Sequence, residues 1–372
     1  GVDTAGAVAG KNSGVIDNVT TLGNYVVATG SGASQEVGSV KLGAAGGIAG
    51  VNQGIISNVT VADAVLAQAD NEEQDSVRVT AGGVTGINQG SISQVNVLSA
   101  VTASQAENSY GLGGVAGLNI SGASIAGAVN TGVTHARYGN TITASSVGGI
   151  AGTNLGSISD SYNDGDITGG KYVGGLVGYN YGGSVSNVVN AGDVYGESEK
   201  FEENEGGIGG LVGFNSGSVT QASNAGAIDG DYYVGGLVGV NASGATLENL
   251  YNSISASITG TDYVGGIAGK NDGKISATSR LVNQGNVVGE SYVGGIAGTN
   301  SGTISASLST GEGTETENRL INQGSVTGLM YVGGIAGQNT KTGVIDNVTN
   351  EVLVLQASDE QAQYFGGIVG DN

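Results

Sequence analysis

Several residue types are missing or scarce in this chain of 372 residues, and each absence excludes a class of protein. There is no cysteine, so disulfide frameworks and thiolate metal sites are excluded. There are 11 Lys and Arg residues against 32 Asp and Glu residues, which gives a net charge of -21. Because nucleic acid and anionic membrane surfaces are bound by clustered Lys and Arg, this balance argues against both as partners.

Long apolar runs are missing as well. A membrane-spanning helix needs about 20 consecutive apolar residues, and no run approaches that length, so we expect no direct membrane insertion. Histidine is nearly absent, since His135 is the only one. A zinc site of the HExxH type needs two histidines, so it is excluded within this chain.

Glycine, in contrast, is abundant at 73 residues, and it recurs in the phrase GG-[ILV]-[AVT]-G-x-N. Twelve copies occur, and their aliphatic third positions lie 26 to 40 residues apart, so a basic unit of 26 residues is lengthened by insertions. A repeat of this length predicts a repeat architecture. The third positions are Val8, Ile48, Val84, Val115, Ile150, Leu176, Leu211, Leu237, Ile267, Ile296, Ile335 and Ile368.

One repeat unit, from Tyr172 to Tyr195, predicts the shape of a coil. It contains three short apolar stretches, YVGGLVGYN, GSVSNVVN and AGDVY, separated by Gly or Asn turns. Helices are disfavoured, because each glycine in a helix interior costs about 1 kcal/mol relative to alanine. We therefore predict an all-β fold, a right-handed, three-sided parallel β-helix of about twelve coils.

The repeat continues over residues 1–372, so we expect one continuous β-solenoid array. Solenoids need polar capping coils at their ends, and no such coil is recognisable in the sequence. We therefore expect the array to be a segment of a longer polypeptide.

Alternation of side chains along YVGGLVGYN predicts which residues face inward. Leu176 is assigned to the interior, because its position always holds Ile, Leu or Val, and Asn180 shares its parity. Val173, Val177 and Tyr179 then face outward. The predicted aliphatic ladder includes Leu176, Leu211, Leu237, Ile267 and Ile296, and the predicted ladder of side-chain amides includes Asn154, Asn180, Asn215, Asn241, Asn271 and Asn300.

Two further signatures recur. The pattern N-x-G-x-[VI] begins at Asn163, Asn190, Asn224, Asn283 and Asn322, and it predicts the next corner of the coil. Tyrosines stand two residues before the glycine pair at Tyr172, Tyr233, Tyr263, Tyr292, Tyr331 and Tyr364. We favour an aromatic ladder that packs coil on coil over an exposed stripe that stacks on sugar rings.

The stretch YVGGLVGYN and its relatives GGIAGTNSGTIS and GGLVGFNSGSV resemble the GLUG motif, named for its G-L-x-G core. That repeat occurs in large bacterial surface and secreted proteins, including adhesins of the filamentous haemagglutinin type. The resemblance covers essentially the whole chain. It implies a scaffold and an extracellular location, and it implies no reaction.

Aspartates form the densest group of chemically active side chains. Asp160, Asp164 and Asp166 are followed one coil later by Asp193. Such carboxylates could serve a polysaccharide-active enzyme or bind calcium. We favour solvated turn residues, because this region keeps the minimal 26-residue repeat and lacks both the EF-hand and the RTX patterns. We therefore expect no enzyme, no catalytic residue and no cofactor, with calcium at Asp160, Asp164 and Asp166 as the remaining metal hypothesis.

Acidic insertions are the expected contact surfaces, because repeat proteins carry their binding variation in insertions. One insertion is DNEEQD, another is ESEKFEENE, and a third spans residues 308–317. The ligand-contact candidates are Asp70, Glu72, Glu73, Asp75, Glu197, Glu199, Glu202, Glu203 and Glu205.

These observations predict a rigid extracellular segment of a bacterial adhesin or stalk, either secreted or attached to the cell surface. Its expected partners are glycans or proteins of host or neighbouring cells. Two alternatives remain open, a filament subunit that self-associates end to end and a polysaccharide-active β-helix enzyme.

Overall fold

The computed structural model describes residues 4–28, 35–37, 40–68, 77–104, 109–138, 141–142, 146–197, 206–307, 319–357 and 363–372. This part of the chain holds no helix, and therefore no apolar helix that could cross a bilayer. The chain forms two compact units. The N-terminal unit comprises Gly1–Val185 and Ala191–Glu197, and the C-terminal unit comprises Ser186–Asn190 and Ser198–Asn372.

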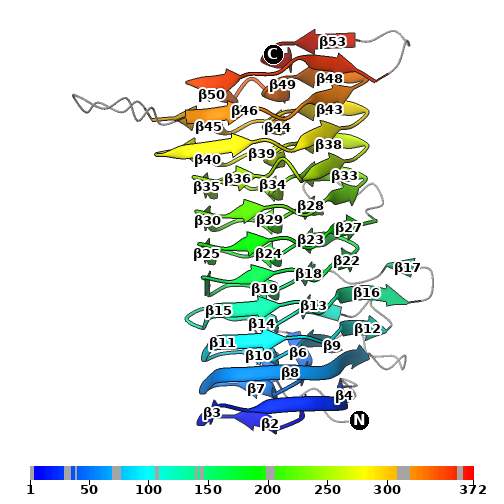
Figure 1. Cartoon of the computed structure of the whole chain (residues 1–372), viewed down its shortest axis with the longest axis vertical. Coiled ribbons are helices and arrows are strands. Elements are labelled where there is room, and N and C mark those ends of the chain that lie inside the picture. The colour runs from blue at the N-terminus through cyan, green and yellow to red at the C-terminus, as the bar shows by residue number, and fades with distance from the viewer. Residues whose placement is uncertain are drawn as a thin grey trace. The chain divides into compact units, whose positions relative to one another are not determined.

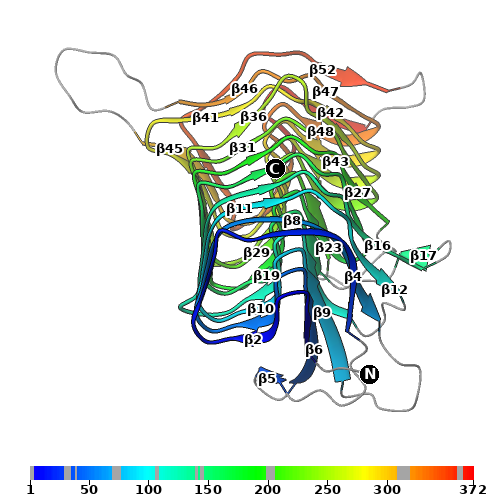
Figure 2. The same cartoon turned by 60° about the horizontal axis from the view of Figure 1, so that its bottom comes forward.

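In the N-terminal unit, each coil passes through three sheets of parallel strands, and successive coils stack in register (Figures 1 and 2). The first sheet contains β1 (Thr4–Gly6), β6 (Val40–Gly46), β9 (Val77–Gly82), β13 (Ser109–Gly113), β18 (Ser146–Gly148) and β23 (Tyr172–Gly174). The second contains β2 (Ala9–Asn12), β7 (Ala49–Asn52), β10 (Thr85–Asn88), β14 (Ala116–Asn119), β19 (Ala151–Asn154) and β24 (Val177–Asn180).

The third sheet of this unit begins with long strands and continues with short ones. It contains β3 (Val15–Asp17), β4 (Thr20–Ala28), β8 (Ile55–Gln68), β11 (Ser91–Val97), β12 (Val101–Ser104), β15 (Ser124–Asn130), β16 (Thr134–Tyr138), β20 (Ser157–Ser159), β21 (Tyr162–Asn163), β22 (Ile167–Gly169) and β27 (Val194–Gly196). Two short strands, β5 (Gln35–Val37) and β17 (Thr141–Ile142), pair antiparallel with β6 and β16. Both lie in insertions between the parallel strands of the coils.

The C-terminal unit repeats this arrangement. Its first sheet contains β28 (Gly207–Gly209), β33 (Tyr232–Gly235), β38 (Asp262–Gly265), β43 (Ser291–Gly294), β48 (Met330–Gly333) and β53 (Gln363–Gly366). Its second contains β29 (Val212–Asn215), β34 (Val238–Asn241), β39 (Ala268–Asn271), β44 (Ala297–Asn300), β49 (Ala336–Asn339) and β54 (Val369–Asp371).

The third sheet of the C-terminal unit consists of short strands. Its members include β31 (Ser223–Asn224), β35 (Thr246–Glu248), β36 (Tyr251–Asn252), β37 (Ser257–Thr259), β40 (Lys274–Ala277), β41 (Arg280–Asn283), β42 (Asn286–Val288), β45 (Thr303–Ala306), β46 (Arg319–Asn322), β47 (Val326–Gly328), β50 (Val344–Asp346), β51 (Val348–Asn350) and β52 (Val354–Gln356). Among the described residues, each unit thus has six parallel strands stacked along its first sheet and six along its second, which confirms the predicted all-β parallel β-helix with about twelve coils in the chain.

The path of one coil differs from the predicted one. YVGGLVGYN forms two strands, β23 and β24, with a bend at Gly175 and Leu176 between them. Leu176 is fully buried, and so are Val173 and Val177, which had been predicted to face outward. The prediction of one alternating strand is wrong, because the bend separates two strands that each have their own alternation.

A ladder of asparagines crosses the coils in each unit, and its members are buried except Asn339 and Asn372 near the C-terminus. Within each unit, the asparagine of one coil donates from Nδ2 to Oδ1 of its counterpart in the next coil. In the N-terminal unit the ladder runs Asn12, Asn52, Asn88, Asn119, Asn154 and Asn180, with N···O distances of 2.8–2.9 Å. In the C-terminal unit it runs Asn215, Asn241, Asn271, Asn300, Asn339 and Asn372, at 2.8–3.0 Å.

Several rungs also close their own turns, namely Asn12, Asn52, Asn88, Asn154 and Asn215. In the coil of Asn154, the side-chain Oδ1 accepts a hydrogen bond from the backbone N–H of Gly156 at 3.2 Å, and Nδ2 contacts the Gly156 carbonyl oxygen at 3.3 Å. Asparagine is favoured at turns because its amide can satisfy backbone groups two residues away. The same amide therefore forms the turn within a coil and the bond to the next coil.

A second amide ladder lies at the N-x-G corner. In the N-terminal unit, Asn130 donates to Asn163 at 2.8 Å. One coil earlier, Val97 occupies this position and offers no donor, so Oδ1 of Asn130 has no hydrogen-bond partner. In the C-terminal unit the ladder runs Asn190, Asn224, Asn252, Asn283, Asn322 and Asn350, at 2.8–3.3 Å.

The glycine pair of the repeat makes room for this second ladder. A Cβ atom at Gly149 would lie 2.3 Å from the side chain of Asn163, and one at Gly266 would lie 2.3 Å from Nδ2 of Asn283. No side chain fits at that distance. The second glycine of the pair is therefore required by close approach to a buried amide.

The first ladder predicts that substituting Asn88 lowers the stability of the fold more than substituting its neighbour Gln89. Asn88 is fully buried, whereas Gln89 accepts a hydrogen bond from Gln53 on the surface. Replacing Asn88 with Ala leaves buried polar groups of the adjacent rungs unpaired, so Asn88→Ala should lower the free energy of unfolding by about 2 kcal/mol. The matched control Gln89→Ala should change it by less than about 0.5 kcal/mol. Urea denaturation followed by circular dichroism measures both, and equal effects of the two substitutions would contradict the role of the ladder.

Candidate functional site

The aspartates singled out in the sequence lie in separate turn contacts. Asp160, Asp164 and Asp166 are all exposed. Asp164 accepts a hydrogen bond from the Tyr162 hydroxyl at 3.2 Å, and Asp166 accepts one from the backbone N–H of Asp193 at 3.1 Å. Among the residues with described positions, no three His, Asp or Glu side chains lie close enough to hold a metal ion.

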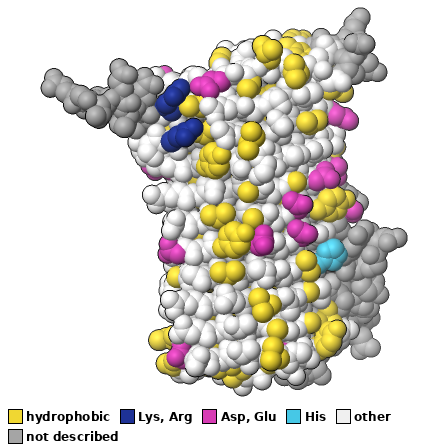
Figure 3. Space-filling view, viewed as in Figure 1, with side chains coloured by type: hydrophobic (Ala, Val, Ile, Leu, Met, Phe, Trp, Pro, Cys, Tyr) yellow, Lys and Arg dark blue, Asp and Glu magenta, His cyan; other side chains and the backbone are white. Residues whose placement is uncertain are grey.

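The Tyr162 hydroxyl lies beside one of these aspartates, Asp164. Partial burial, followed by the nearby Asp164 carboxylate, raises the pKa of the Tyr162 hydroxyl above its ordinary value of 10.0. The Asp164 carboxylate therefore helps to raise the pKa of a phenol that lies two residues away in the same turn. On the face drawn in Figure 3, several acidic side chains lie near one another toward the right edge at mid-height, and the others are spread over the face.

Of the predicted ligand-contact residues, Glu197 lies within the described ranges. It is exposed, and its carboxylate accepts a hydrogen bond from the Tyr195 hydroxyl at 3.0 Å. The others lie outside the described residues, namely Asp70, Glu72, Glu73, Asp75, Glu199, Glu202, Glu203, Glu205 and the insertion at 308–317.

The first and second sheets of each unit approach each other closely, and we call the line along which they meet the groove. The central glycine of the second-sheet strand abuts the backbone of the first sheet, so that a Cβ at Gly152 would lie 2.4 Å from the Leu112 nitrogen. In the C-terminal unit, a Cβ at Gly298 would lie 2.5 Å from the Tyr263 carbonyl carbon. The backbones of the two sheets therefore approach closely along this line.

In the C-terminal unit, tyrosines stack along the coils. Neighbouring rings in the series Tyr233, Tyr263, Tyr292, Tyr331 and Tyr364 have centroids 4.6–5.0 Å apart. Each of these residues has a positive φ of 51–64°, which bends its strand. The alternation of side chains on one side of the tyrosine therefore does not predict which residues face inward on the other side. The stacking of the rings is the coil-on-coil packing that we favoured from the sequence.

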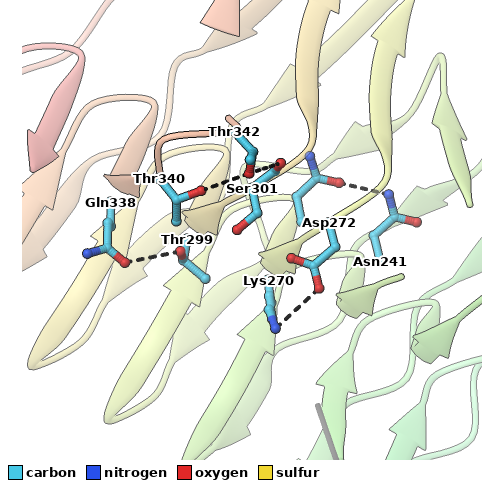
Figure 4. Close-up of polar contacts among 9 residues, drawn as sticks. Asn241, Lys270, Asp272, Thr299, Ser301, Gln338, Thr340 and Thr342 are labelled. Atoms are coloured by element: carbon cyan, nitrogen blue, oxygen red, sulfur yellow. Dashed lines mark hydrogen bonds and ion pairs between the residues drawn. The ribbon is translucent and has the colours of Figure 1, made fainter. Parts of the chain in front are cut away.

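In successive coils of this unit, the residue just before the ladder asparagine is polar, and these residues are Lys270, Thr299, Gln338 and Asp371. Nζ of Lys270 lies 3.2 Å from the Asp272 carboxylate, and Thr299 donates to Gln338 at 3.5 Å (Figure 4). Gln338 in turn donates to Asp371 at 3.1 Å. Figure 4 also shows the Asn241 amide directed at the next rung of the ladder. The charged and polar groups of this row are thus paired with one another.

In the N-terminal unit, the groove is filled differently along its length. An aliphatic cluster of Leu42, Ala44, Val51, Ile87 and Leu118 is fully buried. Leu155 packs against this cluster and also lines a pocket beyond it, with a volume of about 330 Å³. The pocket is lined by Arg78, Ser146, Thr153, Leu155, Lys171, Tyr172, Tyr179 and Tyr181, and we call it the tyrosine pocket.

Aromatic rings form one part of the tyrosine pocket. Tyr172 on β23 and Tyr179 on β24 stack across the groove, with ring centroids 5.1 Å apart and an angle of 22° between the ring planes. Tyr181 meets Tyr179 edge to face at 5.6 Å and is 57% exposed. The three phenols offer flat apolar surface together with polar hydroxyl groups.

Basic and hydroxyl side chains form the remainder. Nζ of Lys171 lies 5.4 Å from the centroid of the Tyr172 ring, and Arg78 reaches the pocket from β9. Ser146 and Thr153, both nearly buried, are hydrogen-bonded to each other at 3.0 Å. Among the described residues that line the pocket, Arg78 and Lys171 are basic and none is acidic.

Sequence reasoning placed Tyr172 in the tyrosine series and did not find this pocket. One signal was present, because residues 171–181 contain Lys171 and three tyrosines within a single copy of the repeat. The residues around Arg78 in the sequence do not indicate that it lines this pocket, because the stacking of coils brings it there from a distant part of the sequence.

Comparison with known proteins supports the repeat assignment. The family model described as the GLUG motif matches residues 143–168 and 169–195. These two matches contain every lining residue of the tyrosine pocket except Arg78. No curated protein and no solved structure matches the chain.

The tyrosine stack predicts a loss of stability at high pH. Burial, followed by the neighbouring Tyr331, raises the pKa of Tyr292 above its ordinary value of 10.0. Because the folded state holds this proton more tightly than the unfolded state, the stabilisation is complete below about pH 10 and is lost as the pH rises through the raised pKa.

The urea concentration at the midpoint of unfolding should therefore decrease when the pH is raised from about 8 to about 10.5. Tyr292→Phe should make this decrease smaller. Tyr251→Phe, which removes a phenol that is 38% exposed, serves as the matched control and should leave the fall unchanged. An identical pH dependence of Tyr292→Phe and the unmodified protein would contradict the prediction.

Proposed function

We propose that the chain is a rigid extracellular scaffold of a bacterial adhesin or stalk, which presents binding surfaces away from the cell and catalyses no reaction. The observation that carries the proposal is the pair of buried amide ladders, which bond each coil to the next within a unit. Bonds of this kind resist bending and local opening of a coil, which is what a mechanical support requires.

The extracellular location is inferred from the GLUG motif. Two copies of the repeat match the GLUG family model. The resemblance to that motif associates the repeat with large surface and secreted proteins of bacteria. Host or neighbouring-cell glycans and proteins are the partners that such a location implies. The net charge of -21 suits this role, because a large net charge keeps an exported protein soluble.

A location test comes first. Antibodies raised against the purified chain should label intact source cells, and brief protease treatment of those cells should remove the label. A cytoplasmic protein detected in parallel controls for lysis. Labelling that appears only after the cells are broken would contradict the extracellular assignment.

An adhesion test then examines the role itself. In-frame deletion of this segment from the native gene should reduce attachment of the cells to a glycan-coated surface, while attachment of cells carrying Asp164→Asn and Asp166→Asn should equal that of the parent strain. Cleavage of a polysaccharide by the purified chain, lost in the same two aspartate variants, would overturn the scaffold proposal in favour of an enzyme.

A further inference from the structure

We propose that an outward-facing apolar patch on the third sheet of the N-terminal unit docks a cationic amphipathic helix of a partner protein. The proposal deepens the adhesive scaffold role by naming a class of partner, and it rests on that role only for where the partner is met. We call this surface the corner patch. It consists of Leu22, Tyr25, Ala62, Ala64, Leu98, Ala100 and Val133.

The register of the coils brings these residues together. β4 and β8 lie side by side, and the following coils stack on β8 (Figure 1). Residues two apart on a strand face the same side, so two adjacent columns of side chains form on the outer face. One column runs Leu22, Ala62, Leu98 and Thr131, and the other runs Tyr25, Ala64, Ala100 and Val133.

Large side chains stand at the two ends of the corner patch. Leu22 and Tyr25 are 72% and 81% exposed at one end, and Leu98 and Val133 are 53% and 44% exposed toward the other. The alanines between them leave room for apolar side chains of a partner. Because coils are about 4.8 Å apart, the patch is about 10–14 Å long, which is the length of two to three turns of a helix.

A buried carboxylate holds one end of the patch in place. Between Leu22 and Tyr25, β4 carries one residue more than β8, and Gly23 in this bulge has a positive φ of 74°. Oδ1 of Asp63 accepts hydrogen bonds from the backbone N–H of Asn24 at 2.9 Å and from its side-chain amide at 3.3 Å. Residues three apart on a regular strand face opposite sides, so the bulge is what lets both large side chains face outward.

The anchor of the bulge costs stability. Asp63 is fully buried, and its second oxygen, Oδ2, has no hydrogen-bond partner. In two later coils the equivalent residues are Gly132 and Gly165, where an added Cβ would lie 2.0 and 2.1 Å from a carbonyl oxygen. The coil of Asp63 therefore departs from the corner that the repeat uses elsewhere. A buried polar group that is only partly satisfied is typical of a functional site.

The charge beyond the patch selects a cationic partner. The two columns of outward side chains continue as Asp164 and Asp166, both exposed, and Asp193 follows one coil later. These carboxylates lie about 12 Å from the centre of the patch along the coils. The chain as a whole carries a net charge of -21, which attracts cations and repels a second copy of itself.

The backbone pairing of β8 favours a helix over an added strand. β8 pairs with β4 on one side and with β11 and β12 on the other, so this part of the third sheet has no open edge. An amphipathic helix binds through a stripe of side chains and needs no backbone bond to its partner. A helix fits the corner patch when its apolar stripe is followed, about eight residues later, by Lys or Arg, since eight residues span about 12 Å.

The test is a titration of the full chain with a fluorescent synthetic peptide of about 18 residues on an alanine-rich, helix-forming background. The peptide carries leucines on one face over its first turns and lysines on the same face over its last turns. One control peptide has glutamate in place of lysine, and a second has the leucines spread around the helix. Fluorescence anisotropy should show that the first peptide binds at least about tenfold more tightly than either control.

Variants of the protein locate the binding surface. Tyr25→Ser combined with Leu98→Ser should weaken binding about tenfold, because each removes apolar contact area. Val15→Ser combined with Ile55→Ser is the matched control, since these two exposed apolar residues are register partners in the same unit outside the patch, and it should leave the affinity unchanged.

The aspartates determine the preference for lysine. Asp164→Asn combined with Asp166→Asn should reduce the preference for the lysine peptide over the glutamate peptide from about tenfold to about twofold. Attachment of cells to a glycan-coated surface should stay unchanged in this variant, because that surface presents no peptide.

Asp63 is a positioning residue in this account, because it acts through the bulge. Asp63→Ala should weaken peptide binding about fivefold, since it removes the acceptor that holds Asn24. Asp63→Asn should restore the affinity, because its side-chain oxygen can accept the same backbone hydrogen bond. Loss of binding in both variants, with the urea midpoint of Asp63→Asn unchanged, would contradict the role of the anchor.

Equal affinity for the three peptides, no binding of any peptide, or equal effects of the patch and control variants would each overturn the proposal. A dimer in sedimentation analysis that Tyr25→Ser with Leu98→Ser dissociates would overturn it in favour of a second copy as the occupant. None of these results bears on the cell-surface location, which the antibody test measures separately. A protein found only inside cells would contradict the scaffold role and leave the measured peptide preference intact.

Discussion

The hydrogen bond between stacked asparagine amides is the interaction on which the rest of this structure depends. The amides of the first ladder bond one coil to the next, and several of them also close the turn of their own coil, as Asn154 does with Gly156 while it donates to Asn180. A buried amide without partners costs about 1–3 kcal/mol, so every rung fixes the register of its neighbours. The glycine pair follows from the same constraint, since Gly149 must admit the amide of Asn163.

Much of the fold could be predicted from the sequence because the repeat has a fixed period and fixed residue types. The twelve copies predicted the coil number, and the short glycine-rich stretches predicted parallel strands. The path within a coil could not be predicted in the same way. Alternation identifies faces only along an unbroken strand, and the bend at Gly175 and Leu176, like the positive φ of Tyr263, interrupts it.

The candidate site was less accessible to sequence reasoning, because it depends on which coils are neighbours and on which side chains fill the groove. In the N-terminal unit, Val51 and Ile87 close the groove in one region, whereas Tyr172 and Tyr179 leave a cavity in another. Tyr179 occupies the same position of the repeat as Val51 and Ile87, so the repeat alone gives no reason to distinguish them. Arg78 joins the pocket through a register that only the folded coils define.

The most direct test of the ladder is hydrogen exchange of the asparagine side-chain amides, measured by NMR on protein labelled with ¹⁵N at asparagine. The account predicts two classes: slowly exchanging amides at ladder positions such as Asn88 and Asn283, and rapidly exchanging amides at exposed positions such as Asn286. Slow exchange is expected because a buried amide exchanges only when its coil opens. Ladder amides that exchange as fast as Asn286 would contradict the central claim.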